Sequence, residues 1–416
     1  MANRDAGLVD LAQAANKKFG AGTLQLAGRQ RPTRGPRLTT GSLSFDYATG
    51  GGLLLGGTSI FYGGESSGKT TAATRIAGLS QQLCANCYRR VPGGVKFPEV
   101  IDEETGEVSY GAPEGATCDC VRTGIVHPRA GQNEHKDDFA ERMARYQENS
   151  YEEFRVAYID VEGTFDEYWA ERVGAVPGRF VLGRTATAEE AIDLHDEIIR
   201  TGSVDLIITD SIAMMTPSAE VEASSSEWQT GLHPRLVTKF ARKATSARAT
   251  IRSDFGRELT EIWINQWRKK IGVTYGDNTT MSGGEGQKFF ASMIVRMWAS
   301  AWERSGVDED LKKEWHMEAA TDVRMNFKTE KNKTARPQVT GAYRMGLVGE
   351  TAAQVLDVDY ILAQAEKHGL MRKDGNKWLL GDEAYKTKGE MVARLTEPAV
   401  RWEMRRTLVQ RMLAAG

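Results

Sequence analysis

FYGGESSGKTT, residues 61–71, combines Gly63, four further residues, and then Gly68, Lys69 and Thr70. This spacing is typical of a loop that wraps backbone N–H groups around nucleotide phosphates. Apolar residues before it predict a buried strand, and the residues after it predict a helix whose positive N-terminus faces the phosphate. We therefore expect a phosphate-binding loop between a strand and a helix. The alternative is a Gly- and Ser-rich turn without a ligand.

Each part of this loop has an expected partner in a nucleotide complex. Its backbone would surround the phosphates, Lys69 would reach the β and γ oxygens, and the Thr70 hydroxyl would bind Mg²⁺. The expected contacts with ATP come from Gly63, Glu65, Ser66, Ser67, Gly68, Lys69, Thr70 and Thr71.

Composition narrows the class of protein. The chain has 416 residues, of which 40% are hydrophobic and 26% charged, and this suits roughly two to three globular domains. No apolar run approaches the length that spans a membrane, so we expect an intracellular, soluble protein. The net charge is −2, so a nucleic-acid site must be local.

The pattern along the chain predicts four parts. Residues 1–38 form an arm, with a short amphipathic helix and a linker rich in Pro and Arg. Residues 39–345 alternate strands and helices, which predicts an α/β core with a mostly parallel sheet covered on both faces. Residues 84–150 are polar and read as a module inserted into that core. Residues 346–416 read as a small helical domain.

Two acidic residues follow apolar strands. Asp210 ends VDLIITD, where a carboxylate can orient Mg²⁺ beside a phosphate loop. Glu162 comes just after FRVAYID, at the sheet edge where α/β proteins bind ligands, and could polarise a water for attack on the γ-phosphate. Asp166 and Trp169 follow at helical spacing, which suits contact with and stacking on adenine. The alternative for this pair is a capping acid and a core tryptophan.

A local cationic segment extends from His233 to Ser253, with six Lys or Arg and no acidic residue. Helical spacing puts its apolar and basic residues on separate faces, so one face would join the core. The basic face holds Arg235, Lys239, Arg242 and Lys243, and the apolar face holds Leu236, Phe240 and Ala244. Read alone, the basic face is either a nucleic-acid contact or an ordinary solvated surface.

The insert contains all four cysteines: Cys84, Cys87, Cys118 and Cys120. A segment with so small an apolar core needs a further source of stability, and an intracellular protein seldom uses disulfides. A structural zinc site with four thiolates is the favoured interpretation. His127 or His135 could replace one thiolate, and unligated thiols or a redox pair are the alternatives.

Six motifs together resemble the RecA-type recombinases of bacteria and bacteriophages. They are TGSLSFDYATGGG, YGGESSGKTT, YIDVEGTFDEYWAERVG, GSVDLIITDSIAMMTP, INQWRKKIGVTYGDNTTMSGGEGQKFFAS and EKNKTARP. The resemblance implies a DNA-dependent ATPase that forms helical filaments on single-stranded DNA and exchanges strands with homologous double-stranded DNA. Single-strand-binding and mediator proteins are implied as further partners, and the cytoplasm of a bacterial or phage-infected cell is implied as the location.

The resemblance also implies residue roles. Glu162 matches the family's catalytic glutamate, and Asp210 matches the aspartate associated with Mg²⁺. Gln266 matches the glutamine that senses the γ-phosphate and relays its presence to the second DNA-binding loop, residues 267–286. Lys331 and Lys333 match lysines that reach the ATP of a neighbouring subunit.

The family's DNA contacts map to the cationic segment and to two loops, residues 217–231 and 267–286. Thr230 stands where many relatives carry an apolar side chain that wedges between bases, so Trp228 is the candidate to supply that wedge. The expected DNA contacts are Trp228, Arg235, Arg242, Arg268, Lys270, Gly283 and Gly284.

Two other functions stay open at this point. A RecA-core hexameric helicase or loader would share the phosphate loop and Asp210, but the N-terminal arm, the KNK pair and the C-terminal part follow the recombinase order. A DNA-binding scaffold with a vestigial ATP site is disfavoured by the intact Lys69, Thr70 and Glu162.

Overall fold

The computed structural model describes residues 35–102, 108–118, 151–223, 231–255, 257–269, 279–304, 320–381 and 383–415, with short stretches at 10–11, 13–15, 17–18, 136–137 and 140. None of the helices in these ranges is both long and apolar enough to cross a membrane. Most of the expected arm, residues 1–38, lies outside the described residues, and so does much of the second half of the insert.

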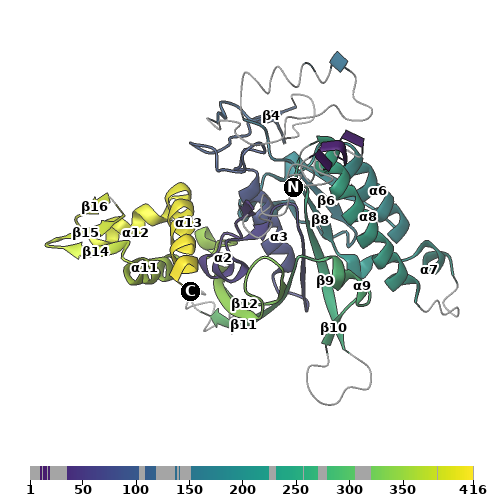
Figure 1. Cartoon of the computed structure of the whole chain (residues 1–416). Helices are drawn as coiled ribbons and strands as arrows, with labels where there is room; N and C mark the ends of the chain where they lie inside the picture. Colours follow the sequence, from purple (N-terminus) through teal and green to yellow (C-terminus); the bar gives the residue numbers. More distant parts are fainter. Residues whose placement is uncertain are drawn as a thin grey trace, which may run out of the picture.

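A nine-stranded sheet forms the centre of the molecule (Figure 1). Its strand order is β13-β12-β11-β3-β9-β8-β6-β7, with β10 paired to β9. The run from β11 to β7 is parallel, whereas β12, β13 and β10 join antiparallel. The expectation of a mostly parallel sheet is therefore confirmed. The strands are β3 (Thr58–Gly63), β6 (Val156–Asp160), β7 (Phe180–Arg184), β8 (Leu206–Asp210), β9 (Thr260–Lys269), β10 (Thr279–Met281), β11 (Met293–Arg304), β12 (Ala320–Asn332) and β13 (Val339–Gly346).

Helices cover both faces of the sheet, which is why β3, β6 and β8 are buried along their whole length. On one face, Phe61 and Ile264 pack with residues of α2 and α3. On the other face, Ile60 and Trp263 pack with residues of α6 and α8. The helices of the core are α2 (Leu43–Thr49), α3 (Lys69–Ser80), α5 (Glu167–Arg172), α6 (Ala188–Arg200), α7 (Ser218–Glu222), α8 (Leu232–Phe255) and α9 (Gly286–Phe290), with 3-10 turns η2 (Pro177–Arg179) and η3 (Ile212–Met214).

The inserted segment begins directly after α3 and contains the hairpin β4 (Glu99–Ile101) and β5 (Val108–Tyr110). A small buried cluster of Cys84, Val91, Val95 and Ala116 lies inside it. The segment is tied to the core at Glu153, which pairs with Arg179 across 2.7 Å and whose backbone bridges to Cys84. A short sheet of β1 (Arg37–Leu38) and β2 (Leu53–Leu54) precedes β3.

The C-terminal part contains a sheet that the sequence interpretation missed. Besides helices it has three antiparallel strands, because Gly375 takes a φ of 55° and allows a two-residue turn between β14 and β15. Its elements are η4 (Gly349–Thr351), α11 (Val358–Lys367), β14 (Met371–Asp374), β15 (Lys377–Leu380), β16 (Glu383–Tyr385), α12 (Lys388–Thr396) and α13 (Pro398–Ala415).

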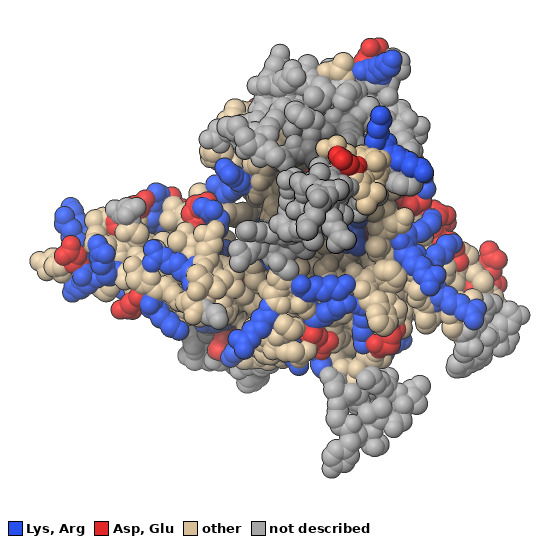
Figure 2. All heavy atoms as spheres, viewed as in Figure 1, with Lys and Arg blue, Asp and Glu red and all other residues tan. Residues whose placement is uncertain are grey.

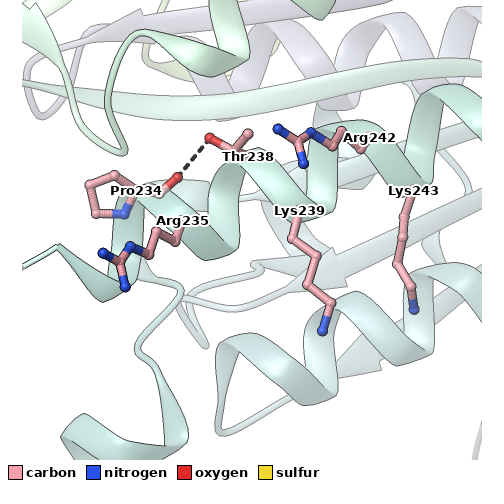
Figure 3. Close-up of a pocket in the computed structure, with 6 residues that line it drawn as sticks. All are labelled: Pro234, Arg235, Thr238, Lys239, Arg242 and Lys243. Atoms are coloured by element: carbon pink, nitrogen blue, oxygen red, sulfur yellow. Dashed lines mark hydrogen bonds between the residues drawn. The ribbon is translucent and has the colours of Figure 1, made fainter.

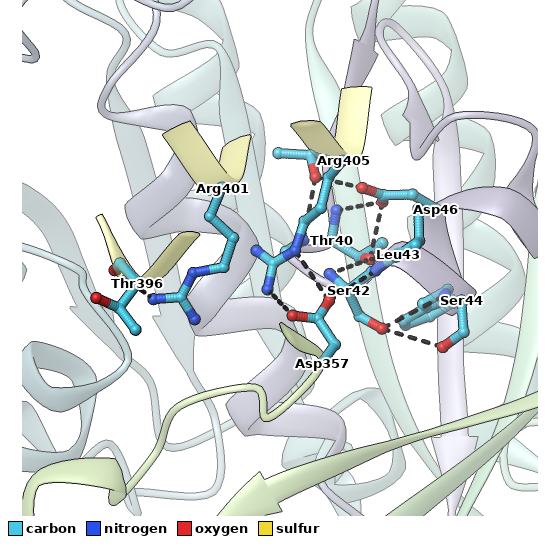
Figure 4. A network of polar contacts seen from close by, with 12 residues as sticks. Thr40, Ser42, Leu43, Ser44, Asp46, Asp357, Thr396, Arg401 and Arg405 are labelled. Carbon is cyan, nitrogen blue, oxygen red and sulfur yellow. Dashed lines mark hydrogen bonds and ion pairs between the residues drawn. The ribbon is translucent and has the colours of Figure 1, made fainter. Parts of the chain in front are cut away.

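A polar network fastens this part to α2 (Figure 4). The Asp357 carboxylate accepts from the Leu43 backbone N–H at 3.1 Å, and Arg405 donates to both of its oxygens at 2.9 and 2.5 Å. Nearby, the Asp46 carboxylate accepts from the Thr40 N–H at 2.7 Å, and burial raises its pKa. The start of α2 is therefore held by residues from both ends of the chain.

Candidate nucleotide site and nucleic-acid interface

The phosphate loop runs from Gly63, the last residue of β3, to Lys69, the first of α3. Two positions of this loop require glycine. A Cβ on Gly63 would come within 2.2 Å of the Met297 carbonyl oxygen, and Gly68 has a φ of 76°. The expected strand, loop and helix are confirmed.

Lys69 lies almost buried at the start of α3. Its ammonium donates to the Gly64 carbonyl at 2.6 Å and to the Ser67 hydroxyl at 3.2 Å, and both acceptors are uncharged. Burial lowers its pKa, while the nearby Asp210 and Glu162 carboxylates oppose this shift. A desolvated cation whose hydrogen bonds go to neutral acceptors is well suited to binding a phosphate.

The hydroxyl of Thr70 donates to the Asp210 carboxylate at 2.7 Å. Tyr158, on the neighbouring strand β6, donates to the same oxygen at 2.7 Å. Burial raises the pKa of Asp210, and these two hydrogen bonds counteract the shift. The oxygen donors fit the preference of Mg²⁺. Our sequence interpretation did not include Tyr158, although its place two residues before the acidic end of β6 could have indicated it.

Glu162 is exposed and lies just beyond β6, beside Asp210. Its backbone N–H donates to the Asp210 carbonyl at 3.2 Å. The turn that carries it is shaped by Asp160, whose carboxylate accepts from the Thr164 and Phe165 N–H groups, both at 3.1 Å. Asp160 is therefore a supporting residue that our sequence interpretation missed.

Asp166 is the N-terminal cap of α5, because its carboxylate accepts from the Trp169 N–H at 3.0 Å. The position of Asp166 therefore agrees with the alternative interpretation, in which this residue caps a helix. The Trp169 indole N–H donates to the Thr71 hydroxyl at 3.1 Å, so this half-buried ring lies against the first turn of α3.

Gln266 pairs in register with Gly63, which puts it level with the start of the phosphate loop. The preceding residue, Asn265, is fully buried and donates to Gln287 at 2.8 Å and to the Ser282 carbonyl at 3.0 Å. This amide network joins the end of β9 to the Gly283–Gly284 turn. That turn packs closely on α8, because a Cβ on Gly283 would come within 2.9 Å of the Val237 side chain. The network was not foreseen from the sequence.

Lys331 and Lys333 lie away from the phosphate loop of their own chain. Lys331 of β12 pairs with Ile294 of β11, and Ile294 pairs in turn with Ile60 of β3. Ile60 precedes Gly63 by three residues, which is about 10 Å along the strand. The Lys331 ammonium donates to the Lys288 carbonyl, and Lys333 donates to the Phe289 carbonyl at 3.3 Å. The Phe289 side chain beside them is 76% exposed.

The cationic segment forms α8, with Phe240, Ala241 and Ala244 buried against the sheet. Basic side chains extend over the region of α6 and α8, interrupted by acidic ones (Figure 2). The exposed face borders a groove of about 500 Å³ (Figure 3), lined by Pro234, Arg235, Thr238, Lys239, Arg242 and Lys243.

These cations are not equivalent. Lys243 pairs with Asp193 at 3.3 Å and Asp196 at 3.4 Å, both on α6. Arg235 and Arg242 are exposed and have no ion-pair partner among the described residues. The two arginines therefore carry the uncompensated charge expected of a DNA contact.

Arg268 is exposed at the base of the β9–β10 hairpin and donates to the Ser282 hydroxyl at 3.4 Å. Trp228, Lys270, Cys120, His127 and His135 lie outside the described residues.

Three of the four cysteines come together. The sulfurs of Cys84, Cys87 and Cys118 all lie within 4.8 Å of one another, and the Cys87 and Cys118 sulfurs are 3.5 Å apart. Tetrahedral zinc with Zn–S bonds of about 2.3 Å places its sulfurs about 3.8 Å apart, so the cluster has the size of such a site. Burial raises the pKa of Cys84 to about 11, which a bound cation would reverse.

The fold and the site define a P-loop nucleotide-binding protein with a cationic helix beside the sheet. A family profile for the RecA N-terminal domain matches residues 8–88 and 141–345, and the gap between the two matched ranges, residues 89–140, lies within the inserted segment. Protein RecA of Chloroherpeton thalassium is 27% identical over 367 residues, covering 87% of this chain and 77% of the relative. Protein RecA of Bifidobacterium longum is 28% identical over 374 residues, covering 90% and 72%.

The chain belongs to the RecA family of recombinases, which are DNA-dependent ATPases.

Proposed function

We propose that this protein binds ATP and Mg²⁺, assembles as a helical filament on single-stranded DNA, and exchanges that strand with homologous duplex DNA. The contact of Thr70 with Asp210, next to the desolvated Lys69, carries this proposal. Thr70 and Asp210 supply oxygen ligands for Mg²⁺, and Lys69 supplies a cation, at the point where the phosphates of ATP would meet the N-terminus of α3.

In this proposal Glu162 accepts a proton from the attacking water. It lies beyond the carboxyl end of β6, next to Asp210, and is open to solvent, so that water can reach it. Bound Mg²⁺ would neutralise phosphate charge. Gln266 would contact the γ-phosphate from the end of β9, and Trp169 would stack on the adenine beside Thr71, while Asp166 holds the helix that carries Trp169.

A second subunit completes the site. Lys331 and Lys333 are too far from their own phosphate loop to act there, and the exposed Phe289 beside them is an apolar contact for another protomer. We propose that this surface packs against a neighbouring ATP site, with the N-terminal arm, residues 1–38, as a further subunit contact. Hydrolysis then depends on assembly.

DNA would run along the exposed face of α8. Arg235 and Arg242 supply phosphate contacts, and Arg268 adds a third from the β9–β10 hairpin. Residues 217–231 and 267–286, including Trp228, Lys270, Gly283 and Gly284, would form the loops that hold the bases. Action on DNA agrees with a place in the cytoplasm and with single-strand-binding and mediator proteins as partners.

The insert would hold one structural zinc ion through Cys84, Cys87, Cys118 and Cys120. The spacing of the three described sulfurs and the small apolar cluster around them support this assignment.

Electron microscopy of the protein with single-stranded DNA and a slowly hydrolysed ATP analogue tests the main proposal. Helical filaments are expected. Closed rings would instead favour the helicase or loader.

A further inference from the structure

The end of β9 presents two neighbouring side chains to opposite faces of the sheet. Ile262 and Ile264 pack on the face covered by α3, so Gln266 follows on that face. Trp263 packs on the face covered by α8, so Trp267 follows on that face. Gln266 therefore approaches the phosphate loop from one side and Trp267 from the other.

Trp267 lies directly against the first residue after β3. A Cβ built on Gly64 would come within 3.1 Å of the indole nitrogen and within 3.4 to 3.5 Å of two ring carbons. The Arg296 guanidinium lies over the same ring, 5.1 Å from its centroid. The indole thus contacts both a cation and the Gly64 backbone, although it remains 38% exposed.

Gly64 also contacts the lysine that would bind the nucleotide. Its carbonyl accepts the Lys69 ammonium at 2.6 Å, and that ammonium must turn away to bind a phosphate. The Gly64 peptide therefore changes partners when the site fills, and the indole packs on that peptide.

We propose that Trp267, held by Arg296, is a positioning residue that couples the state of the phosphate loop to the DNA-binding face. The contacts continue from Gly64 through Trp267 to Met281, its partner in β10, and from there to the Gly283 turn on Val237 of α8. This inference rests on the proposed DNA-dependent hydrolysis of ATP.

Trp267→Ala in the full chain tests it, with ATP hydrolysis measured with and without single-stranded DNA. We expect the stimulation by DNA to fall about tenfold, because coupling between sites is usually worth 5- to 150-fold. Since coupling is reciprocal, the gain in DNA affinity caused by an ATP analogue should fall by a similar factor. Trp267→Phe, which keeps an aromatic face for Arg296, should recover most of both effects.

Trp302→Ala is the matched control, since Trp302 is 47% exposed near the end of β11 and pairs with Val323 of β12. It should keep the wild-type stimulation. If Trp267→Ala does not fold, the same measurements are made on Arg296→Gln, which removes the cation over the ring and keeps the indole. The stimulation by DNA should again fall. Equal proportional losses with and without DNA, or unchanged stimulation, would overturn the inference. A wild-type protein without any DNA-stimulated hydrolysis would instead overturn the proposed function on which it rests.

Discussion

The Thr70 hydroxyl and the Asp210 carboxylate are joined by a 2.7 Å hydrogen bond across 140 positions of the chain. This bond links the first turn of α3 to the last residue of β8. The strand that leads into α3, β3, is not a neighbour of β8, because β9 lies between them in the sheet. With Tyr158 donating to the same oxygen, the carboxylate is oriented before any ion arrives. Preorganised ligands of this kind lower the cost of binding Mg²⁺ and ATP together.

Glu162→Gln should lower ATP turnover at least about 100-fold and leave ATP and DNA binding intact, because the attacking water loses its proton acceptor. Steady-state hydrolysis and nucleotide binding measure the two effects separately. Glu167→Gln, an exposed acid on α5, serves as the control and should change little. Hydrolysis by Glu162→Gln at the wild-type rate would remove Glu162 from this role.

Changing both Lys331 and Lys333 to Ala should preserve nucleotide affinity of the monomer and abolish DNA-stimulated hydrolysis, because these lysines would act on the ATP of a neighbour. Mixing this variant with Lys69→Ala protein should restore part of the activity, since each subunit supplies what the other lacks. Lys367→Ala, distant on α11, is the control. Filaments that form from the mixture yet never regain hydrolysis would contradict shared sites.

Arg235→Gln and Arg242→Gln should each weaken DNA binding and reduce the slope of log affinity against log salt by about one. Lys243→Gln removes a charge from the same helix and should have a smaller effect, because Asp193 and Asp196 already compensate Lys243. Fluorescence titrations at several salt concentrations measure both quantities. Salt slopes of Arg235→Gln and Arg242→Gln that equal the wild-type slope would show that the α8 face does not contact phosphates.

Elemental analysis should find one zinc ion per chain, and both Cys84→Ser and Cys118→Ser should lose it. Cys120→Ser, His127→Ala and His135→Ala then identify the fourth ligand. Removing the ion should lower the melting temperature, because the apolar cluster around Cys84 is small. Metal-free native protein with four readily alkylated thiols would exclude the site.

Asp357→Ala should destabilise the junction of α2 with the C-terminal part by about 3 to 5 kcal/mol, because it leaves the nearly buried Arg405 without its ion-pair partner and removes the acceptor of the Leu43 N–H. Denaturation and hydrogen exchange of residues 43–49 measure the loss. Asp322→Ala breaks a similar pair with Arg344, which is 55% exposed, and should cost less than about 1 kcal/mol. Similar losses in the two variants would contradict this difference.

The sequence alone determined the features that depend on local spacing. Gly63, Gly68, Lys69 and Thr70 specify a phosphate loop because a strand, a tight turn and a helix N-terminus need few distant contacts. The same holds for the amphipathic α8 and for the alternation that produces a mostly parallel sheet. The buried strand that ends at Asp210 was likewise predicted from its own apolar residues.

Only the tertiary structure decided which side chains meet across elements. Packing of α6 on α8 compensates Lys243, whereas Arg235 and Arg242 have no ion-pair partner in the part of the chain that the structure describes, although all three are equivalent in the helical pattern. The contact of Trp267 with Gly64 depends on sheet register, which a single sequence does not display. The bond of Asp357 to Arg405 needs the C-terminal part docked on α2, because long-range contacts arise only when separate surfaces are buried together.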